Sequence, residues 1–111
     1  MIRVLLSLDL IDSEDQRDNF YDFLKAKKWQ KTKDVDTVWT IRYPNSDPEK
    51  DAAYENIKLN IKTTLIEAAT EFKLKKIRYV AQIGNKQYIA KSIMKEGNEY
   101  KQFRRDLYPK K

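Results

Sequence analysis

The chain has 111 residues, with neither cysteine nor histidine, and its 23 lysines and arginines outnumber its 17 aspartates and glutamates. This length fits one domain with a single core. The missing residue types exclude disulfides, thiolate nucleophiles, Ser-His and Cys-His dyads, and zinc held by cysteine or imidazole. Because no leader pattern and no long apolar run occurs, the sequence predicts a soluble, cytoplasmic protein without membrane contact.

The opening segment MIRVLLSLDLID is predicted to be a strand that ends in a carboxylate. Side chains of a strand alternate between its two faces, which separates an apolar face from a mixed one. The apolar face carries Val4, Leu6, Leu8 and Leu10, and the mixed face carries Arg3, Leu5, Ser7 and Asp9. We therefore expect the carboxylate of Asp9 to leave the sheet on a side that helices do not cover.

A helix is predicted to start at Ser13, which has a glutamine three residues later as in a capping box, and to end near Lys28. Its apolar side carries Phe20, Phe23 and Leu24. Trp29 is expected to plug the end of this helix. The branched and aromatic residues from Val35 to Tyr43 predict a second strand.

A turn cluster, PNSDP, is followed by a long predicted helix with Asp47 as its cap and Pro48 in its first turn. Its buried stripe comprises Ala53, Ile57, Ile61, Leu65, Ala68 and Phe72. Two short strands, residues 77–83 and 87–90, are predicted to form a hairpin around Gly84. The segment 92–111 loses clear periodicity and allows one final helix.

This order of elements predicts an α+β fold, a ferredoxin-like βαβαββ sandwich with two helices on one face of the sheet. We place this domain at residues 1–91 and a basic, aromatic C-terminal tail at residues 92–111. The candidates to line the other face of the sheet are Asp9, Ser7, Arg3, Trp39 and Tyr79, with plain core as the alternative for Trp39. Since tryptophan and tyrosine seldom stay bare on a sheet, we expect a homodimer.

The segments LLSLDL, KKW and DTVWTI resemble the small CRISPR-associated adaptation endonucleases and their relatives, the VapD-like toxins and the GhoS-type antitoxin endoribonucleases. The segment YVAQIGNKQYIA is similar to bacterial members of the same superfamily. The resemblance covers about residues 2–92. It implies a dimer in which the Asp9 carboxylates of two protomers face each other and hold a divalent metal that activates water on a phosphodiester. The long second helix and the basic tail depart from the family pattern.

Any metal would be held by oxygen ligands, which suit magnesium or manganese. Asp9 is the candidate catalytic residue and metal ligand, with Asp12 as a second candidate. An alternative for Asp9 is a loop carboxylate that accepts hydrogen bonds from the following amides, and Asp12 could simply precede the helix. The acidic residues that follow would repel phosphates from this region.

Basic residues supply candidate contacts to RNA or DNA. The predicted nucleic-acid-binding residues are Lys27, Lys28, Lys31, Arg78, Arg104 and Arg105. Tyr100, Phe103 and Tyr108 could stack on bases or pack on the domain. For the cations at helix ends, the alternative is that they complement the helix dipole.

Together these features predict a nucleic-acid-binding, ferredoxin-like homodimer, with the activity of a divalent-metal-dependent endoribonuclease of toxin-antitoxin or CRISPR-adaptation type. Whether the chain is an enzyme stays open at this point. The alternative is a non-catalytic protein-binding module, an antitoxin or phage-encoded inhibitor, that docks a protein partner through its open sheet face or its tail. A metabolic enzyme is disfavoured because only two glycines occur and no phosphate-cradling loop is present.

Overall fold

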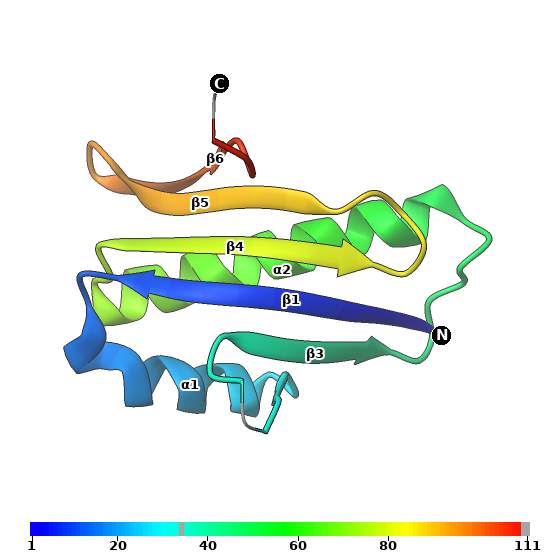
Figure 1. Ribbon diagram of the computed structural model, residues 1–111, viewed down its shortest axis with the longest axis horizontal. Coiled ribbons are helices and arrows are strands. Elements are labelled where there is room, and N and C mark those ends of the chain that lie inside the picture. The colour runs from blue at the N-terminus through cyan, green and yellow to red at the C-terminus, as the bar shows by residue number, and fades with distance from the viewer. Residues whose placement is uncertain (34, 110–111) are drawn as a thin grey trace.

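The computed structural model describes residues 1–33 and 35–109, and these form one sheet and two α-helices (Figure 1). The strands are β1 (Ile2–Ile11), β2 (Gln30–Lys31), β3 (Val38–Tyr43), β4 (Lys76–Ile83), β5 (Ile89–Glu96) and β6 (Glu99–Arg104). The helices are α1 (Arg17–Ala26), which follows the short 3-10 helix η1 (Glu14–Gln16), and α2 (Asp51–Phe72). The predicted α+β class is confirmed. Neither α-helix combines the length and the apolarity needed to cross a bilayer.

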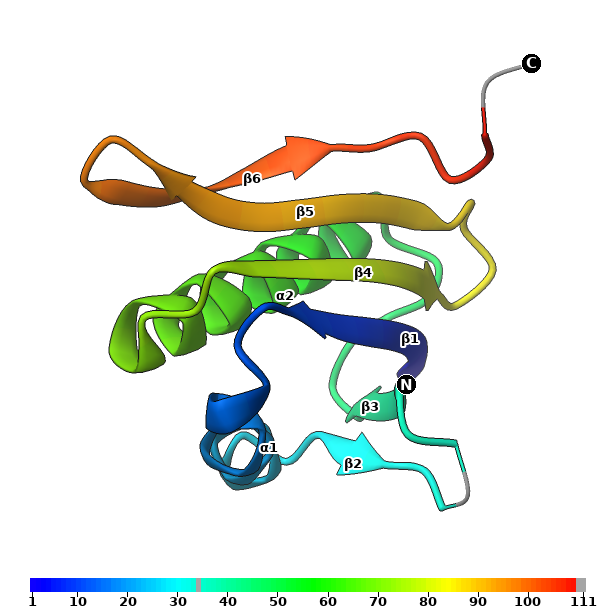
Figure 2. The same ribbon diagram turned by 60° about the vertical axis from the view of Figure 1, so that its left-hand side comes forward.

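The six strands lie in the order β2-β3-β1-β4-β5-β6, and every neighbouring pair is antiparallel. β1 therefore lies in the interior of the sheet, between β3 and β4. The helices α1 and α2 contact each other, and α2 lies behind the strands in Figure 1. Figure 2 shows the sheet more obliquely, with both helices along one side of it. One face of the sheet is thus covered and the other is open.

The order of elements differs from the predicted βαβαββ because two strands were not expected. β2 has two residues and pairs with β3 at one border of the sheet, Gln30 opposite Thr40. β6 pairs with β5 along its whole length, from Glu99 opposite Glu96 to Arg104 opposite Lys91. Most of residues 92–104 of the predicted tail therefore belong to strands of the sheet, and no helix occurs in residues 92–109, so the final helix allowed there is wrong.

Alternation along β1 separates the two faces of the sheet as the sequence predicts. The buried set comprises Ile2, Val4, Leu6, Leu8 and Leu10, while Arg3, Leu5 and Asp9 between them are exposed. The buried side chains share one core with the inner stripe of α2, including Ile57, Ile61 and Leu65. Trp29 completes this core at the end of α1 and is 3% exposed, which confirms its predicted burial.

Trp39 and Tyr79 lie on the covered face, so their predicted place on the open face is wrong. Trp39 pairs with Leu6 across β1 and β3, and Tyr79 pairs with Leu8 across β1 and β4. Directly opposed residues of antiparallel strands point to the same side of a sheet. Both rings therefore join the core, with 0% and 1% exposure, and the expected homodimer cannot rest on them.

The two residues predicted to cap the helices, Ser13 and Asp47, accept other hydrogen bonds. Ser13 makes no capping hydrogen bond with its side chain, because its Oγ accepts a hydrogen bond of 2.9 Å from the backbone N of Lys75. This contact ties the end of β1 to the segment before β4. Asp47 accepts a hydrogen bond of 2.9 Å from the backbone N of Glu49, within the turn that precedes α2. Both helices consequently begin later than predicted.

Ionisation of Tyr43 makes the stability of the fold decrease at alkaline pH. Its hydroxyl donates a hydrogen bond of 2.7 Å to Oδ1 of Asn60, and burial raises the pKa of Tyr43 to about 12 from the ordinary value of 10.0. Between these values the folded protein keeps a proton that the unfolded chain loses. The free energy of unfolding therefore falls as the pH rises through this interval.

We expect a Tyr43→Phe variant to lose less of its free energy of unfolding than the unmodified protein between pH 10.0 and about 12. The reason is that phenylalanine has no proton to release in the unfolded chain. Urea unfolding at a series of pH values, followed by circular dichroism, measures this difference. Identical pH slopes in the two proteins would contradict the assigned role of Tyr43.

Candidate nucleic-acid interface

The open face of the sheet has an apolar centre. Leu5 on β1 is 54% exposed there. Its neighbour on the same face is Ser7, which lies between Val38 of β3 and Val80 of β4. These residues and the C-terminal segment, with Tyr108, line a pocket of about 280 Å³. The centre of the open face is thus a shallow apolar surface that an aromatic side chain helps to line.

Arginines surround this apolar centre. Arg3 and Arg42 lie directly opposite each other on β1 and β3, and Arg78 on β4 lies opposite Asp9. The backbone N of Arg105 donates a hydrogen bond of 3.4 Å to a β5 carbonyl oxygen, which continues the β5–β6 pairing. We call these four arginines the arginine rim. Among the described residues, no ion pair with nitrogen and oxygen within 4.0 Å includes a member of the rim.

Asp9 lies near the exit of β1 on the open face, and its side chain is exposed. Within residues 1–33 and 35–109, the carboxylate of Asp9 accepts no hydrogen bond from the backbone amides that follow it. Its cross-strand neighbour is the cation Arg78. The carboxylate is therefore accessible from the side on which the arginine rim lies.

The surroundings of Asp9 do not fit a divalent cation within one chain. Over the described ranges, no group of three or more His, Cys, Asp or Glu side chains is placed to hold a metal ion. Asp12 is exposed in the turn after β1, where its backbone has a φ of 54°. One carboxylate beside a guanidinium supplies too few oxygen ligands for magnesium or manganese. A metal site here would need Asp9 from a second copy of the chain.

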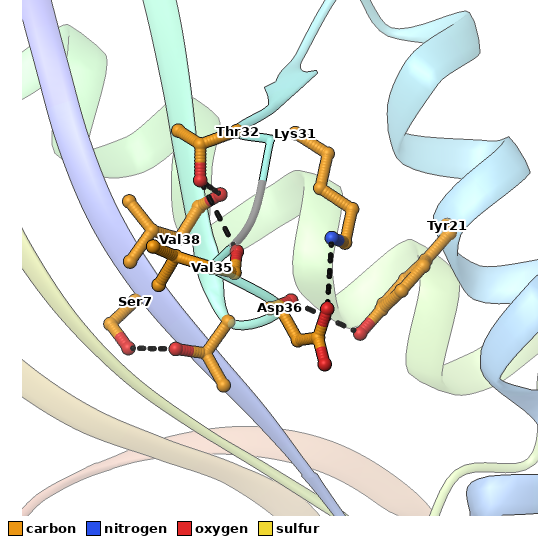
Figure 3. A network of polar contacts seen from close by, with 8 residues as sticks. Ser7, Tyr21, Lys31, Thr32, Val35, Asp36 and Val38 are labelled. Carbon is orange, nitrogen blue, oxygen red and sulfur yellow. Dashed lines mark hydrogen bonds and ion pairs between the residues drawn. The ribbon is translucent and has the colours of Figure 1, made fainter.

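A polar network holds the segment before β3 close to the Asp9 end of β1 (Figure 3). Ser7 Oγ donates a hydrogen bond of 3.2 Å to the hydroxyl of Thr37. Lys31 Nζ lies 3.7 Å from the carboxylate of Asp36 and 5.8 Å from the ring centre of Tyr21. The charge of Lys31 is therefore already balanced within the protein.

The predicted basic residues do not form one surface. Lys27 at the end of α1 lies 3.3 Å from the carboxylate of Glu67 on α2, so it joins the two helices. Lys28 follows in the turn that ends α1, with a φ of 71°. Arg104 shares a side of β6 with Gln102, which accepts a hydrogen bond from the core residue Tyr79. Arg104 thus lies toward the helical side of the sheet.

Of the predicted basic residues, Arg78 and Arg105 are brought to the open face. Arg3 and Arg42 join them there, although the sequence did not predict them to bind nucleic acid. In β1, the alternation of Arg3 with Ile2 and Val4 was a usable signal for the face on which Arg3 lies. The antiparallel register that puts Arg3 opposite Arg42 is not visible in the sequence.

Comparisons of the chain with protein-family models, with curated proteins and with solved structures found no match. The functional interpretation therefore depends on the open face itself. Its two defining features are an apolar centre and a surrounding set of arginines, none of which forms an ion pair within 4.0 Å in the described part of the chain, although Arg78 has Asp9 as its cross-strand neighbour.

Proposed function

We propose that this chain is a ferredoxin-like protein that binds single-stranded nucleic acid on the open face of its sheet. The strand order β2-β3-β1-β4, with α1 linking β1 to β2 and α2 linking β3 to β4, supports a ferredoxin-like unit. β5 and β6 extend this unit on one side. The resemblance to CRISPR-associated adaptation endonucleases, VapD-like toxins and GhoS-type endoribonucleases is compatible with this arrangement and stays a prediction.

The arginine rim is the observation that carries the proposal. On β1, β3 and β4 the open face carries Arg3, Arg42, Lys76 and Arg78 against a single acidic residue, Asp9. Guanidinium groups bind phosphate with paired hydrogen bonds, and Coulomb attraction to phosphates dominates nucleic-acid affinity. A set of basic residues that outnumbers the acidic ones on one face is therefore suited to the backbone of RNA or DNA.

The apolar centre favours single strands over duplexes. Bases of a single strand are free to pack against a sheet, whereas a duplex buries them in its stack. Leu5 and Val80 offer an apolar surface, and Tyr88 and Tyr108 are 39% and 69% exposed beside it. Phosphates would then lie along the arginine rim, with bases directed toward the centre.

Fluorescence anisotropy with labelled single-stranded RNA, single-stranded DNA and duplexes tests this proposal. We expect Arg78→Gln to weaken single-strand binding about tenfold and to reduce the salt slope by about one. Lys62→Gln is the matched control, because Lys62 is exposed on α2, on the covered side of the sheet. Equal effects of the two substitutions, or no binding at low salt, would refute the proposed interface.

Metal-dependent endoribonuclease activity is the second candidate, favoured by the exposure of Asp9 beside the rim. This candidate requires a homodimer in which two Asp9 carboxylates come together, and magnesium or manganese as the added cation. We expect Asp9→Asn to abolish metal-dependent cleavage of RNA while leaving binding within about threefold. Equal residual cleavage by this variant, or a strict monomer by light scattering, would reject the candidate.

The non-catalytic alternative is a module that docks a protein partner on the same face. The exposed Leu5 and its apolar neighbours favour this alternative, because such surfaces commonly mark interfaces. This alternative and the first proposal predict different results in the binding assay. A docking module would leave all the oligonucleotides unbound at low salt, and its interaction with a partner would be weakened by Leu5→Asp.

A further inference from the structure

We propose that a cleft at one end of the open face binds the terminal phosphate of the nucleic-acid strand, an inference that rests on the proposed function. The cleft has a volume of about 550 Å³. It lies where β1 begins and where β3 and β4 end, at the end of the sheet marked by the N-terminus in Figure 1. Its polar lining includes Arg3, Thr40, Arg42, Gln82 and Asn85.

Two like charges meet in this cleft without compensation. Arg3 and Arg42 are directly opposed across β1 and β3, an arrangement that destabilises a sheet when both residues are cations. No acidic residue is among those that line the cleft. Within the described residues neither arginine takes part in an ion pair. A phosphate monoester, with nearly two negative charges, would offset both guanidinium groups.

Two carboxylates of the segment that leads into α2 have partners of their own. Asp51 at the start of α2 lies 3.0 Å from Nζ of Lys86. Asp47 accepts the hydrogen bond from the backbone of Glu49 in its own turn. Neither lines the cleft, so the positive charge of the two arginines stays available to a ligand.

The wall of the cleft is fixed before any ligand binds. The backbone N of Gly84 donates a hydrogen bond of 2.9 Å to the carbonyl oxygen of Arg3. Gln82 Nε2 donates to the carbonyl oxygens of Gly84, at 3.0 Å, and Lys86. Tyr54 packs so closely that a Cβ on Gly84 would lie 3.1 Å from it. Because the turn is already ordered, binding costs little conformational entropy.

The shape of the cleft favours a strand end over an internal phosphate. Its lining combines Leu5 and Thr40, which lie on the open face, with Pro48 and Tyr54, which lie before and within α2. A strand that runs along the open face toward this end of the sheet meets those residues. Its last phosphate would therefore lie between Arg3 and Arg42.

Anisotropy with one oligonucleotide sequence in three forms tests the inference: 5′-phosphorylated, 3′-phosphorylated and hydroxyl at both ends. We expect one phosphorylated form to bind about tenfold more tightly than the hydroxyl form. Arg3→Gln and Arg42→Gln should each remove this preference, whereas Arg78→Gln should weaken all three forms alike. Thermal unfolding midpoints no lower than that of the unmodified protein would show that the variants are folded.

The possible failures are distinguishable. Equal affinity for the three forms would overturn the terminal-phosphate inference and leave the proposed nucleic-acid interface in place. Absence of any oligonucleotide binding would overturn the proposed function. In that case, titration with inorganic phosphate still tests the cleft: shifts in the amide resonances of Arg3 and Gly84 would support a phosphate site, and unmoved resonances would overturn it.

Discussion

The Leu6→Asp variant is expected to be unfolded at room temperature, whereas the Leu5→Asp variant is expected to fold normally. Leu6 is 1% exposed on the covered face of β1, and Leu5 is 54% exposed on the open face. A carboxylate at position 6 would lose the burial of a leucine and place an unpaired charge in the core. Such a cost is comparable to the whole stability of a domain, about 5–15 kcal/mol.

Circular dichroism and urea unfolding of the two variants measure this difference directly. The free energy of unfolding of Leu5→Asp should stay within about 1 kcal/mol of the unmodified protein. The same variant should nevertheless bind single strands more weakly, because its new negative charge lies inside the arginine rim. Equal destabilisation of both variants would contradict the assignment of the two faces of β1.

The second large effect is expected at Trp39, where replacement by alanine should lower the free energy of unfolding by about 3–5 kcal/mol. The indole is fully buried, and its ring centre lies 5.3 Å from that of Tyr21 in an edge-on contact. Within the described residues, Trp39 Nε1 is buried without a hydrogen-bond partner. Trp39→Phe should therefore cost much less, since it keeps an aromatic ring and removes an unsatisfied donor.

Chemical unfolding of three variants checks this prediction. Trp39→Ala and Trp39→Phe report on the core, and Val38→Ala on the open face is the neighbouring control. The control should lower the free energy of unfolding by about 1 kcal/mol or less. A loss for Trp39→Phe as large as that for Trp39→Ala would contradict this prediction.

The two faces of β1 could be predicted from the sequence because one set of alternate positions is uniformly apolar. The sequence of β3 gave no such signal. Trp39 and Ile41 alternate with Val38 and Thr40, and both sets suit a sheet, so only the pairing of Trp39 with Leu6 decides which set is buried. The same holds for Tyr79 on β4, whose pairing with Leu8 places it in the core.

The sequence patterns predicted neither the short border strands nor the long-range contacts. β2 has two residues, too few for a period to be recognised. In β6, the sequence EYKQFR lacks a continuous apolar face, and pairing with β5 defines it as a strand. The hydrogen bond from Lys75 to Ser13 joins residues 62 positions apart, whereas a capping box considers only local spacing.

Only part of the candidate site could be predicted from the sequence, for similar reasons. Asp9 and Arg78 were each identified, but their opposition across β1 and β4 depends on the register. Runs of lysine were the most visible basic feature of the sequence. Lys27 at the end of α1 is nevertheless paired with Glu67 on α2, and Lys31 on β2 is paired with Asp36 in the segment before β3. The isolated arginines of alternating strands form the proposed binding surface instead.

The borders of the sheet also bear on self-association. An unpaired border strand can template the addition of further chains, and charged side chains are the usual protection against fibril growth. β6 carries Lys101 and Arg104 along its outer border, whereas β2 covers β3 with two residues only. Among the described residues, the part of β3 beyond Trp39 and Thr40 has no paired strand on its outer border, so a lysine introduced there would discourage the addition of further chains.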